Sequence, residues 1–281
     1  MANINGNNNA NTLTGTAAAD TINGRGGNDT LFGGLGDDTL IGGSGVDTAT
    51  YAGGAAVHAD LTLGVATGQG NDILIEIENL RGSSFNDTLK GNAGNNTIQG
   101  GAGADLIIAT AGFDTLSGGA DIDTVDFSVL TSGMSANLAT GTYSSAFGSG
   151  QMSGIENLVG SSQNDTLTGN NASNTINGGL GNDILNGGGG IDTLSYAGVQ
   201  AHNFINLATG VVTQQWSAQT VGTDTVSNFE NVIGGDYSDF IHGNAANNVI
   251  NGGDSTDTLY ASLGVDVLDG GTGANDTADF S

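Results

Sequence analysis

The sequence predicts an all-β fold, a solenoid of nonapeptide repeats in which short parallel strands stack on one another and longer β-strand inserts interrupt the stack. The first observation is a nine-residue period. Asp20, Asp29, Asp38 and Asp47 each belong to a glycine-rich hexamer, and each is followed by Thr and an apolar residue. The second is a content of 51 Gly and no Pro, and the Gly residues break every candidate helix. The third is an alternation of polar and apolar residues without helical periodicity.

One nonapeptide is expected to form a turn followed by a short strand. Gly residues permit the positive φ angles that tight turns require. Because side chains alternate across a strand, the apolar residue two positions after each Asp, such as Ile22 or Leu40, points inward and the intervening Thr points outward. One inward residue buries too little surface alone, so the units must stack, two to a rung. Residues 18 apart in the sequence then lie about 4.8 Å from one another.

The repeats form four blocks, at about 6–50, 82–126, 160–195 and 234–281, separated by inserts at about 51–81, 127–159 and 196–233. Each insert opens on an aromatic residue, contains an alternating segment typical of strands and closes on a Glu-Asn pair. The pairs are Glu78-Asn79, Glu156-Asn157 and Glu230-Asn231. They either add metal ligands or form a stacked Asn ladder or turn cap, and the second interpretation is favoured. We expect a single domain over residues 1–281 whose inserts widen certain rungs, because each insert returns the chain to the same phase.

Charge and hydropathy exclude several kinds of partner. The chain has 29 acidic residues against three basic ones, Arg25, Arg81 and Lys90, for a net charge of −26. Such a chain repels itself when compact and needs bound cations, and it has no basic patch for nucleic acid. No apolar run is long enough for membrane insertion, and the first residues lack the features of a secretory signal peptide. No Cys is present, so thiols say nothing of the redox compartment.

Stacked turns would bring acidic side chains together. Facing carboxylates repel one another unless a cation lies between them. Ca²⁺ takes about six to eight oxygen ligands from carboxylates and carbonyls, and glycine turns expose their carbonyls. Mg²⁺ prefers a tighter octahedron with its own waters, and three His without Cys offer Zn²⁺ no plausible site. Asp and Gly also make good turns without a metal, but recurrence at one phase in four blocks favours calcium. The expected stacks are Asp20 over Asp38, Asp29 over Asp47, Asp87 over Asp105 over Asp123, Asp165 over Asp183, and Asp239 over Asp257.

The pattern Gly-Gly-x-Gly-x-Asp-x-apolar-x, seen most clearly at 33–41, resembles the calcium-binding repeat of RTX (haemolysin-type) proteins. The resemblance covers nearly the whole chain. It implies a parallel β-roll with Ca²⁺ held between turns, export by a type I secretion system and folding outside the cell. Arg25 replaces the second Gly of one turn, and Asn96, Asn174 and Asn248 replace Asp, so we expect weak binding or none there. The implied metal ligands are Asp20, Asp29, Asp38, Asp47, Asp87, Asp105, Asp114, Asp123, Asp165, Asp183, Asp192, Asp239, Asp257, Asp266 and Asp276, with turn residues Gly33, Gly34, Leu35, Gly36, Gly42, Gly43 and Gly45.

No enzymatic activity is expected. The sequence contains neither His-Glu-x-x-His nor Gly-x-Ser-x-Gly, and His58, His202 and His242 are far apart. We expect a secreted calcium-binding structural protein of the cell surface or extracellular matrix, of the S-layer or matrix-fibre type. The alternatives are an RTX secretion and folding module of a larger exoprotein or adhesin, and ice or ligand binding by an outward row of Thr21, Thr30, Thr39 and Thr48.

The expected partner is a second copy of the chain. Residues 3–5 align with 88–90, and residues 276–281 match 123–128, so the sequence begins and stops in mid-repeat. Both ends of the solenoid would expose unpaired strand edges, which normally invite another chain. We therefore expect head-to-tail self-assembly through the solenoid ends. A cell-surface polysaccharide is a further candidate partner.

Overall fold

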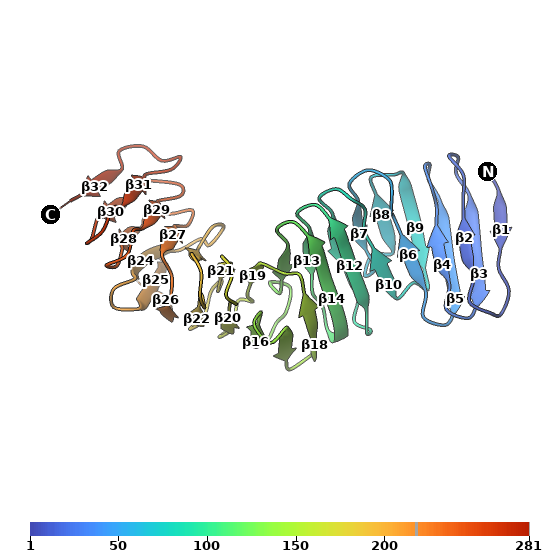
Figure 1. Cartoon of the computed structure of the whole chain (residues 1–281), viewed down its shortest axis with the longest axis horizontal. Coiled ribbons are helices and arrows are strands. Elements are labelled where there is room, and N and C mark those ends of the chain that lie inside the picture. Colours follow the sequence, from blue (N-terminus) through green and yellow to red (C-terminus); the bar gives the residue numbers. More distant parts are fainter. Residues whose placement is uncertain (217–218, 281) are drawn as a thin grey trace. The chain divides into compact units, whose positions relative to one another are not determined.

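A computed structural model describes residues 1–216 and 219–280. Ser281, at the end of the segment expected to match 123–128, lies outside the described residues. The described residues form strands and no helix. They therefore contain no helix long and apolar enough to cross a membrane. It divides into two compact units, the first Met1–Val129 with Phe147–Ile155 and the second Leu130–Ala146 with Glu156–Ser281. Figure 1 shows the strands as ladders of short, neighbouring arrows.

In the first unit, the chain passes back and forth between two sheets. One sheet has the order β1 (Asn3–Asn5), β3 (Thr21–Gly26), β5 (Thr39–Ser44), β9 (Asn71–Ile75), β8 (Val65–Thr67), β7 (His58–Asp60), β11 (Thr88–Lys90), β13 (Leu106–Ile108) and β15 (Thr124–Asp126). The other contains β2 (Thr12–Thr14), β4 (Thr30–Phe32), β6 (Thr48–Thr50), β10 (Asn79–Arg81), β12 (Thr97–Ala102), β14 (Gly112–Ala120) and β18 (Gly148–Ser153).

The second unit repeats this alternation. Its first ladder is β19 (Asn157–Val159), β21 (Thr175–Asn177), β23 (Thr193–Ser195), β27 (Asn231–Ile233), β29 (Val249–Asn251) and β31 (Val267–Asp269). Its second is β17 (Thr142–Ser145), β16 (Met134–Asn137), β20 (Thr166–Thr168), β22 (Ile184–Asn186), β26 (Gln219–Ser227), β25 (Val211–Trp216), β24 (His202–Asn206), β28 (Phe240–His242), β30 (Thr258–Tyr260) and β32 (Thr277–Asp279).

The register confirms the predicted parallel rungs. Asn3 pairs with Thr21 and Thr21 with Thr39 on one sheet, so each step along the ladder is two nonapeptides. Thr30 pairs with Thr48 on the other sheet. The predicted outward row of four Thr residues is therefore wrong as a single row, because successive nonapeptides alternate between sheets and divide it into two.

The core is a column of single inward residues from each strand. Ile22, Leu31 and Leu40 are fully buried, as the spacing predicts. At the start of the chain, Ile4 and Leu13 are only half-buried. Because each nonapeptide contributes one such residue, the core is narrow, and a given side chain packs mainly against those of the neighbouring rungs.

The inserts form antiparallel meanders, which corrects the expectation that they widen rungs. In the first insert, β7, β8 and β9 run antiparallel to one another, while β9 pairs in parallel with β5 and β7 with β11. One strand of the regular ladder is thus replaced by three. The third insert does the same on the other sheet through β24, β25 and β26. In the second, β16 and β17 form an antiparallel pair. An odd number of strands restores the chain direction, so the parallel ladder resumes in phase.

The narrow core predicts a large effect of removing one inward side chain. Leu89 is fully buried, whereas Leu63, in the first insert, is 71% exposed. We expect Leu89→Ala to lower the free energy of unfolding by about 2–5 kcal/mol through lost burial and a residual cavity. Leu63→Ala should change it by less than about 0.5 kcal/mol. Urea unfolding in saturating Ca²⁺ measures both. Equal effects would contradict this assignment of the core.

Candidate metal sites

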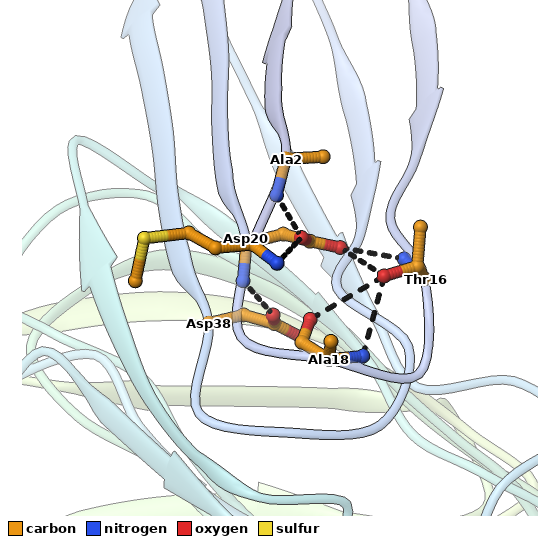
Figure 2. A network of polar contacts seen from close by, with 6 residues as sticks. Ala2, Thr16, Ala18, Asp20 and Asp38 are labelled. Carbon is orange, nitrogen blue, oxygen red and sulfur yellow. Dashed lines mark hydrogen bonds and ion pairs between the residues drawn. The ribbon is translucent and has the colours of Figure 1, made fainter.

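The phase Asp residues, defined as the sixth residue of each hexamer, form columns held by a recurring hydrogen bond. The amide of Asp20 donates to Oδ1 of Asp38 at 2.7 Å (Figure 2). The amide of Asp29 donates to Oδ1 of Asp47 at 2.7 Å. Every predicted stack is confirmed as a pair of neighbours. One carboxylate oxygen is therefore used by the backbone of the preceding rung, and the carboxylates are not simply facing each other. The remaining bonds of this kind are Asp87 to Asp105, Asp105 to Asp123, Asp165 to Asp183, Asp239 to Asp257 and Asp257 to Asp276.

The second carboxylate oxygen lies against the first glycine of its own hexamer. A Cβ on Gly33 would lie 2.4 Å from Asp38 Oδ2, and one on Gly42 would lie 2.6 Å from Asp47 Oδ2. A side chain at Gly33 or Gly42 would therefore collide with this oxygen, although Ala109 and Ala261 occupy the same position in two other hexamers. The same oxygen is buried and has no hydrogen-bond partner among the described residues in Asp29, Asp38, Asp47, Asp105, Asp183 and Asp257.

Turns of one kind, which we name open turns, have positive φ at both the second and the fourth residue of the hexamer. In the Asp38 turn these are Gly34 at 98° and Gly36 at 101°, while Leu35 between them is exposed and donates its amide to Thr16 O. Gly43 and Gly45 show the same conformation, at 101° and 149°. All six Asp residues with an unpartnered oxygen belong to this kind. The open turns end at Asp29, Asp38, Asp47, Asp105, Asp123, Asp183, Asp192 and Asp257.

Turns of the other kind close on themselves. In these self-capped turns the amide of the second residue donates to the phase side chain, as Thr16 does to Asp20 Oδ2 at 2.7 Å (Figure 2). The Thr16 hydroxyl donates to the same oxygen, and the Ala2 amide donates to Oδ1. These hydrogen bonds, that from Thr16 first, lower the pKa of Asp20. The other phase residues capped in this way are Asn11, Asp87, Asn96, Asp165, Asn174, Asp239, Asn248 and Asp266.

The two kinds of turn divide the residues predicted as ligands. Asp20, Asp87, Asp165, Asp239 and Asp266 have hydrogen-bond partners on both oxygens. In the open turns of Asp29, Asp38, Asp47, Asp105, Asp183 and Asp257, one carboxylate oxygen instead has no partner among the described residues. Arg25, expected to weaken its turn, adopts a φ of 75° and keeps the open conformation that glycine has elsewhere. Asp114 and Asp192 accept the amides of Asn96 and Asn174.

Two further acidic residues, Asp72 and Asp224, join the columns from within the inserts and were missed in the sequence. The Asp38 amide donates to Asp72 Oδ1 at 3.0 Å, and the Asp183 amide donates to Asp224 Oδ1 at 2.9 Å. The Tyr196 hydroxyl donates to Asp224 Oδ2 at 2.6 Å. The available signal is the apolar residue two positions after each, Leu74 and Val226, as in a regular nonapeptide.

The second insert serves as an internal comparison for the Tyr–Asp pair. Phe127 stands where the third insert has Tyr196, and Gly150 lies opposite Asp114 where a column Asp would otherwise be. The buried hydroxyl and the buried carboxylate are thus both absent. Since an unpaired buried polar group is costly, this joint replacement indicates that the two groups satisfy each other.

The Asn residues of the Glu-Asn pairs bridge successive rungs. Oδ1 of Asn79 accepts the amide of Thr97 at 2.8 Å, and Oδ1 of Asn157 accepts that of Thr175 at 3.0 Å. Asn231 and Val249 are related in the same way at 2.9 Å. The favoured interpretation of an Asn that links stacked rungs agrees with these contacts.

Burial makes the unpartnered carboxylates of Asp105, Asp183 and Asp257 electrostatically unfavourable. It raises the pKa of Asp105 and of Asp257 to about 6, and the pKa of Asp183 to about 8. Each of these shifts is opposed by an amide hydrogen bond and increased by neighbouring carboxylates, Asp87 beside Asp105 and Asp224 beside Asp183. A bound cation would remove this cost.

The available ligands suit a hard cation. In the described part of the chain, no three His, Cys, Asp or Glu side chains converge into a metal site. A cation between turns would therefore take backbone carbonyls together with one or two carboxylates. Ca²⁺ accepts that mixture of oxygens at about 2.3–2.6 Å. The orphaned carboxylate oxygens and the glycine turns thus fit the predicted ion.

Comparison with known families gives the same result. The RTX calcium-binding nonapeptide repeat matches residues 5–40, 14–49, 81–116, 99–127, 153–194, 233–268 and 243–276, more than half of the chain. The chain belongs to the RTX calcium-binding repeat family. No curated protein matches it. Every predicted Asp ligand lies within a matched range of this RTX chain, whereas Asp72, Asp224, Glu78 and Glu230 lie between the ranges.

The raised pKa of Asp183 predicts a pH dependence of the metal-free protein. The pKa of Asp183 in the folded state, about 8, exceeds its ordinary value of 3.8. Between these two pH values the folded state therefore binds a proton that the unfolded state has released. This contribution to stability is complete at acid pH and is lost as pH rises through about 8. We expect metal-free protein to gain β-structure on acidification, measured by circular dichroism. Asp183→Asn should weaken this dependence, whereas the exposed control Asp269→Asn should retain it. A metal-free protein that loses β-structure on acidification would contradict the assignment.

Proposed function

We propose that this RTX-repeat chain is a structural protein that folds outside the cell when it binds calcium. The observation that carries the proposal is the set of open turns, in which buried carboxylate oxygens of Asp29, Asp38 and Asp47 lack a partner in the described residues. Such groups are stable only with a cation or a proton. Low cytosolic calcium would leave the chain unfolded and suited to export. Extracellular calcium would then fold it.

Calcium binding and folding are coupled through the columns. Oδ2 of Asp29 and Oδ2 of Asp47 would bind the ion together with turn carbonyls. Oδ1 of each residue would keep its hydrogen bond from the amide of the preceding rung. Bound Ca²⁺ supplies the positive charge that offsets carboxylate repulsion and desolvation. Because only the folded state assembles these turns, the binding free energy adds to the stability of the fold.

The calcium requirement is tested by circular dichroism and calorimetry. In chelator we expect coil, and millimolar Ca²⁺ should restore the β signal. Asp105→Asn, in an open turn, should lower the number of bound ions. The matched control is Asp20→Asn, because self-capped turns already carry Asn at positions 11, 96, 174 and 248. Full β content in chelator would overturn the proposal.

End-to-end assembly is a second proposed property, and it would make the protein a component of an S-layer or matrix fibre. Its support is the incomplete burial of the terminal rungs. Ile4 and Leu13 are half-buried at one end, and Leu268 is half-buried at the other. Another chain docked on each end would cover these residues and pair the edge strands. Alternatively, the chain is an RTX module of a larger exoprotein or adhesin, and other parts of that protein would cover these residues.

Assembly is tested by electron microscopy of the purified chain. We expect filaments or sheets in millimolar Ca²⁺, lost in chelator and after deletion of residues 270–281, since exposed strand edges and core residues at the ends drive the contact. The deletion also removes Asp276, whose Oδ1 accepts the Asp257 amide, so circular dichroism in Ca²⁺ must show that the rest of the fold is retained. A strict monomer at high protein concentration in Ca²⁺ would contradict assembly.

A further inference from the structure

The Glu of two insert-closing Glu-Asn pairs occupies the position of a phase Asp in the column. The Asp47 amide donates to Glu78 Oε2 at 2.8 Å, and the Asp192 amide donates to Glu230 Oε2 at 2.9 Å. The same kind of bond joins the Asp29 amide to Asp47 Oδ1 at 2.7 Å. Glu78 thus follows Asp47 on its side of the first unit, and Glu230 follows Asp192 in the second.

The backbone before each Glu brings a carbonyl oxygen to the preceding open turn. Glu76 and Asn228, two residues earlier, have φ of 53° and 57°, and the strand register places them opposite Gly42 and Gly187. The carbonyl oxygen of Glu76 lies 2.0 Å from where a Cβ of Gly42 would be, and that of Asn228 lies 2.0 Å from the corresponding point of Gly187. These are the first glycines of the Asp47 and Asp192 hexamers.

Oxygen atoms therefore converge on the Asp47 turn. Asp47 Oδ2 lies 2.6 Å from the same Cβ position of Gly42 that the Glu76 carbonyl approaches. This oxygen is buried, on a residue with no exposed surface, and has no hydrogen-bond partner in the described chain. The Glu78 carboxylate is held to the same rung by the Asp47 amide. An unpartnered anionic oxygen beside a carbonyl and a second carboxylate forms a set of ligands for a hard cation.

We propose that Glu78 and Glu230 are calcium ligands, each completing a cation site with the preceding Asp47 or Asp192 turn at the last rung of an insert. This inference rests on the calcium binding proposed above and extends it to residues outside the nonapeptides. The sites join the last open turn before an insert to the rung that follows it.

The next rung explains why each site ends its column. The amides of Glu78 and Asn79 both donate to Asp47 O, at 3.1 and 2.9 Å. The Glu78 amide therefore points to the preceding rung and does not donate to the side chain of the following rung, as a phase Asp amide would. The Glu78 carbonyl accepts instead from Asn96 Nδ2 at 2.6 Å, a bond that Asp could not make as a carboxylate. Asn248 and Glu230 repeat the contact at 2.6 Å, and Asn174 and Glu156 at 2.8 Å. Asn at these positions therefore donates a hydrogen bond that a carboxylate could not donate.

The test counts calcium ions bound to the full chain by native mass spectrometry, with calorimetry for stoichiometry. Glu78→Gln and Glu230→Gln each keep an oxygen for the Asp amide and remove the charge. We expect each variant to bind one ion fewer than the unmodified protein, and the double variant two fewer. Asp269→Asn, which removes one charge from an exposed side chain outside the proposed sites, should bind the full number.

Each outcome of this experiment is decisive. An unchanged count in both single variants, or an equal loss in Asp269→Asn, would overturn the assignment and leave Glu as a hydrogen-bond acceptor only. If one variant fails to fold in saturating Ca²⁺, the other, in the other unit, gives an independent count. Failure of the unmodified protein to bind Ca²⁺ would instead contradict the proposed function, which separates the two conclusions.

Discussion

The structure depends on one hydrogen bond repeated along each column, from the backbone amide of a phase Asp to the carboxylate of the phase residue in the next rung. Asp20 to Asp38 and Asp29 to Asp47 are typical, both at 2.7 Å. The bond fixes the register between rungs and draws the carboxylate out of water. In turns such as those of Asp38 and Asp47, it also places the second oxygen against the first glycine of the hexamer, where a Cβ would collide. Register, acidity and glycine content therefore have a common origin.

A carboxylate buried in this way has three outcomes in the chain. In self-capped turns, the amide of the second hexamer residue, such as Thr16 or Gly235, satisfies it. In the third insert, a buried Tyr196 hydroxyl does so. In the open turns of Asp29, Asp38, Asp47, Asp105, Asp183 and Asp257, positive φ at two positions accompanies an oxygen with no partner in the described residues, and there we propose that a cation binds. The narrow core contributes one inward residue per nonapeptide, so the columns carry much of the specificity of the fold.

The inserts preserve the columns while changing the sheets. Three antiparallel strands replace one parallel strand, and the chain re-enters the ladder in its original direction. Asp72 extends the Asp38 column into the first insert, and Glu78 continues the Asp47 column at its end. The RTX repeat therefore tolerates long interruptions, because the amide-to-carboxylate bond requires only a suitably placed acid on the next rung.

The sequence by itself determined the all-β class, the parallel stacking, the inward ladder and the pairs of neighbouring Asp residues. These follow from a fixed period, because each contact joins residues 18 apart and every nonapeptide repeats the same local chemistry. Only the tertiary structure decided which turns are open and that the Thr row divides between sheets. It also showed that Asp224 and Glu78 belong to the columns. Those contacts span 41 and 31 residues across inserts, so no constant spacing marks them. Turn closure depends on backbone angles, and residue type alone does not fix these angles: Arg25 lies in an open turn, whereas Gly235 lies in a self-capped one.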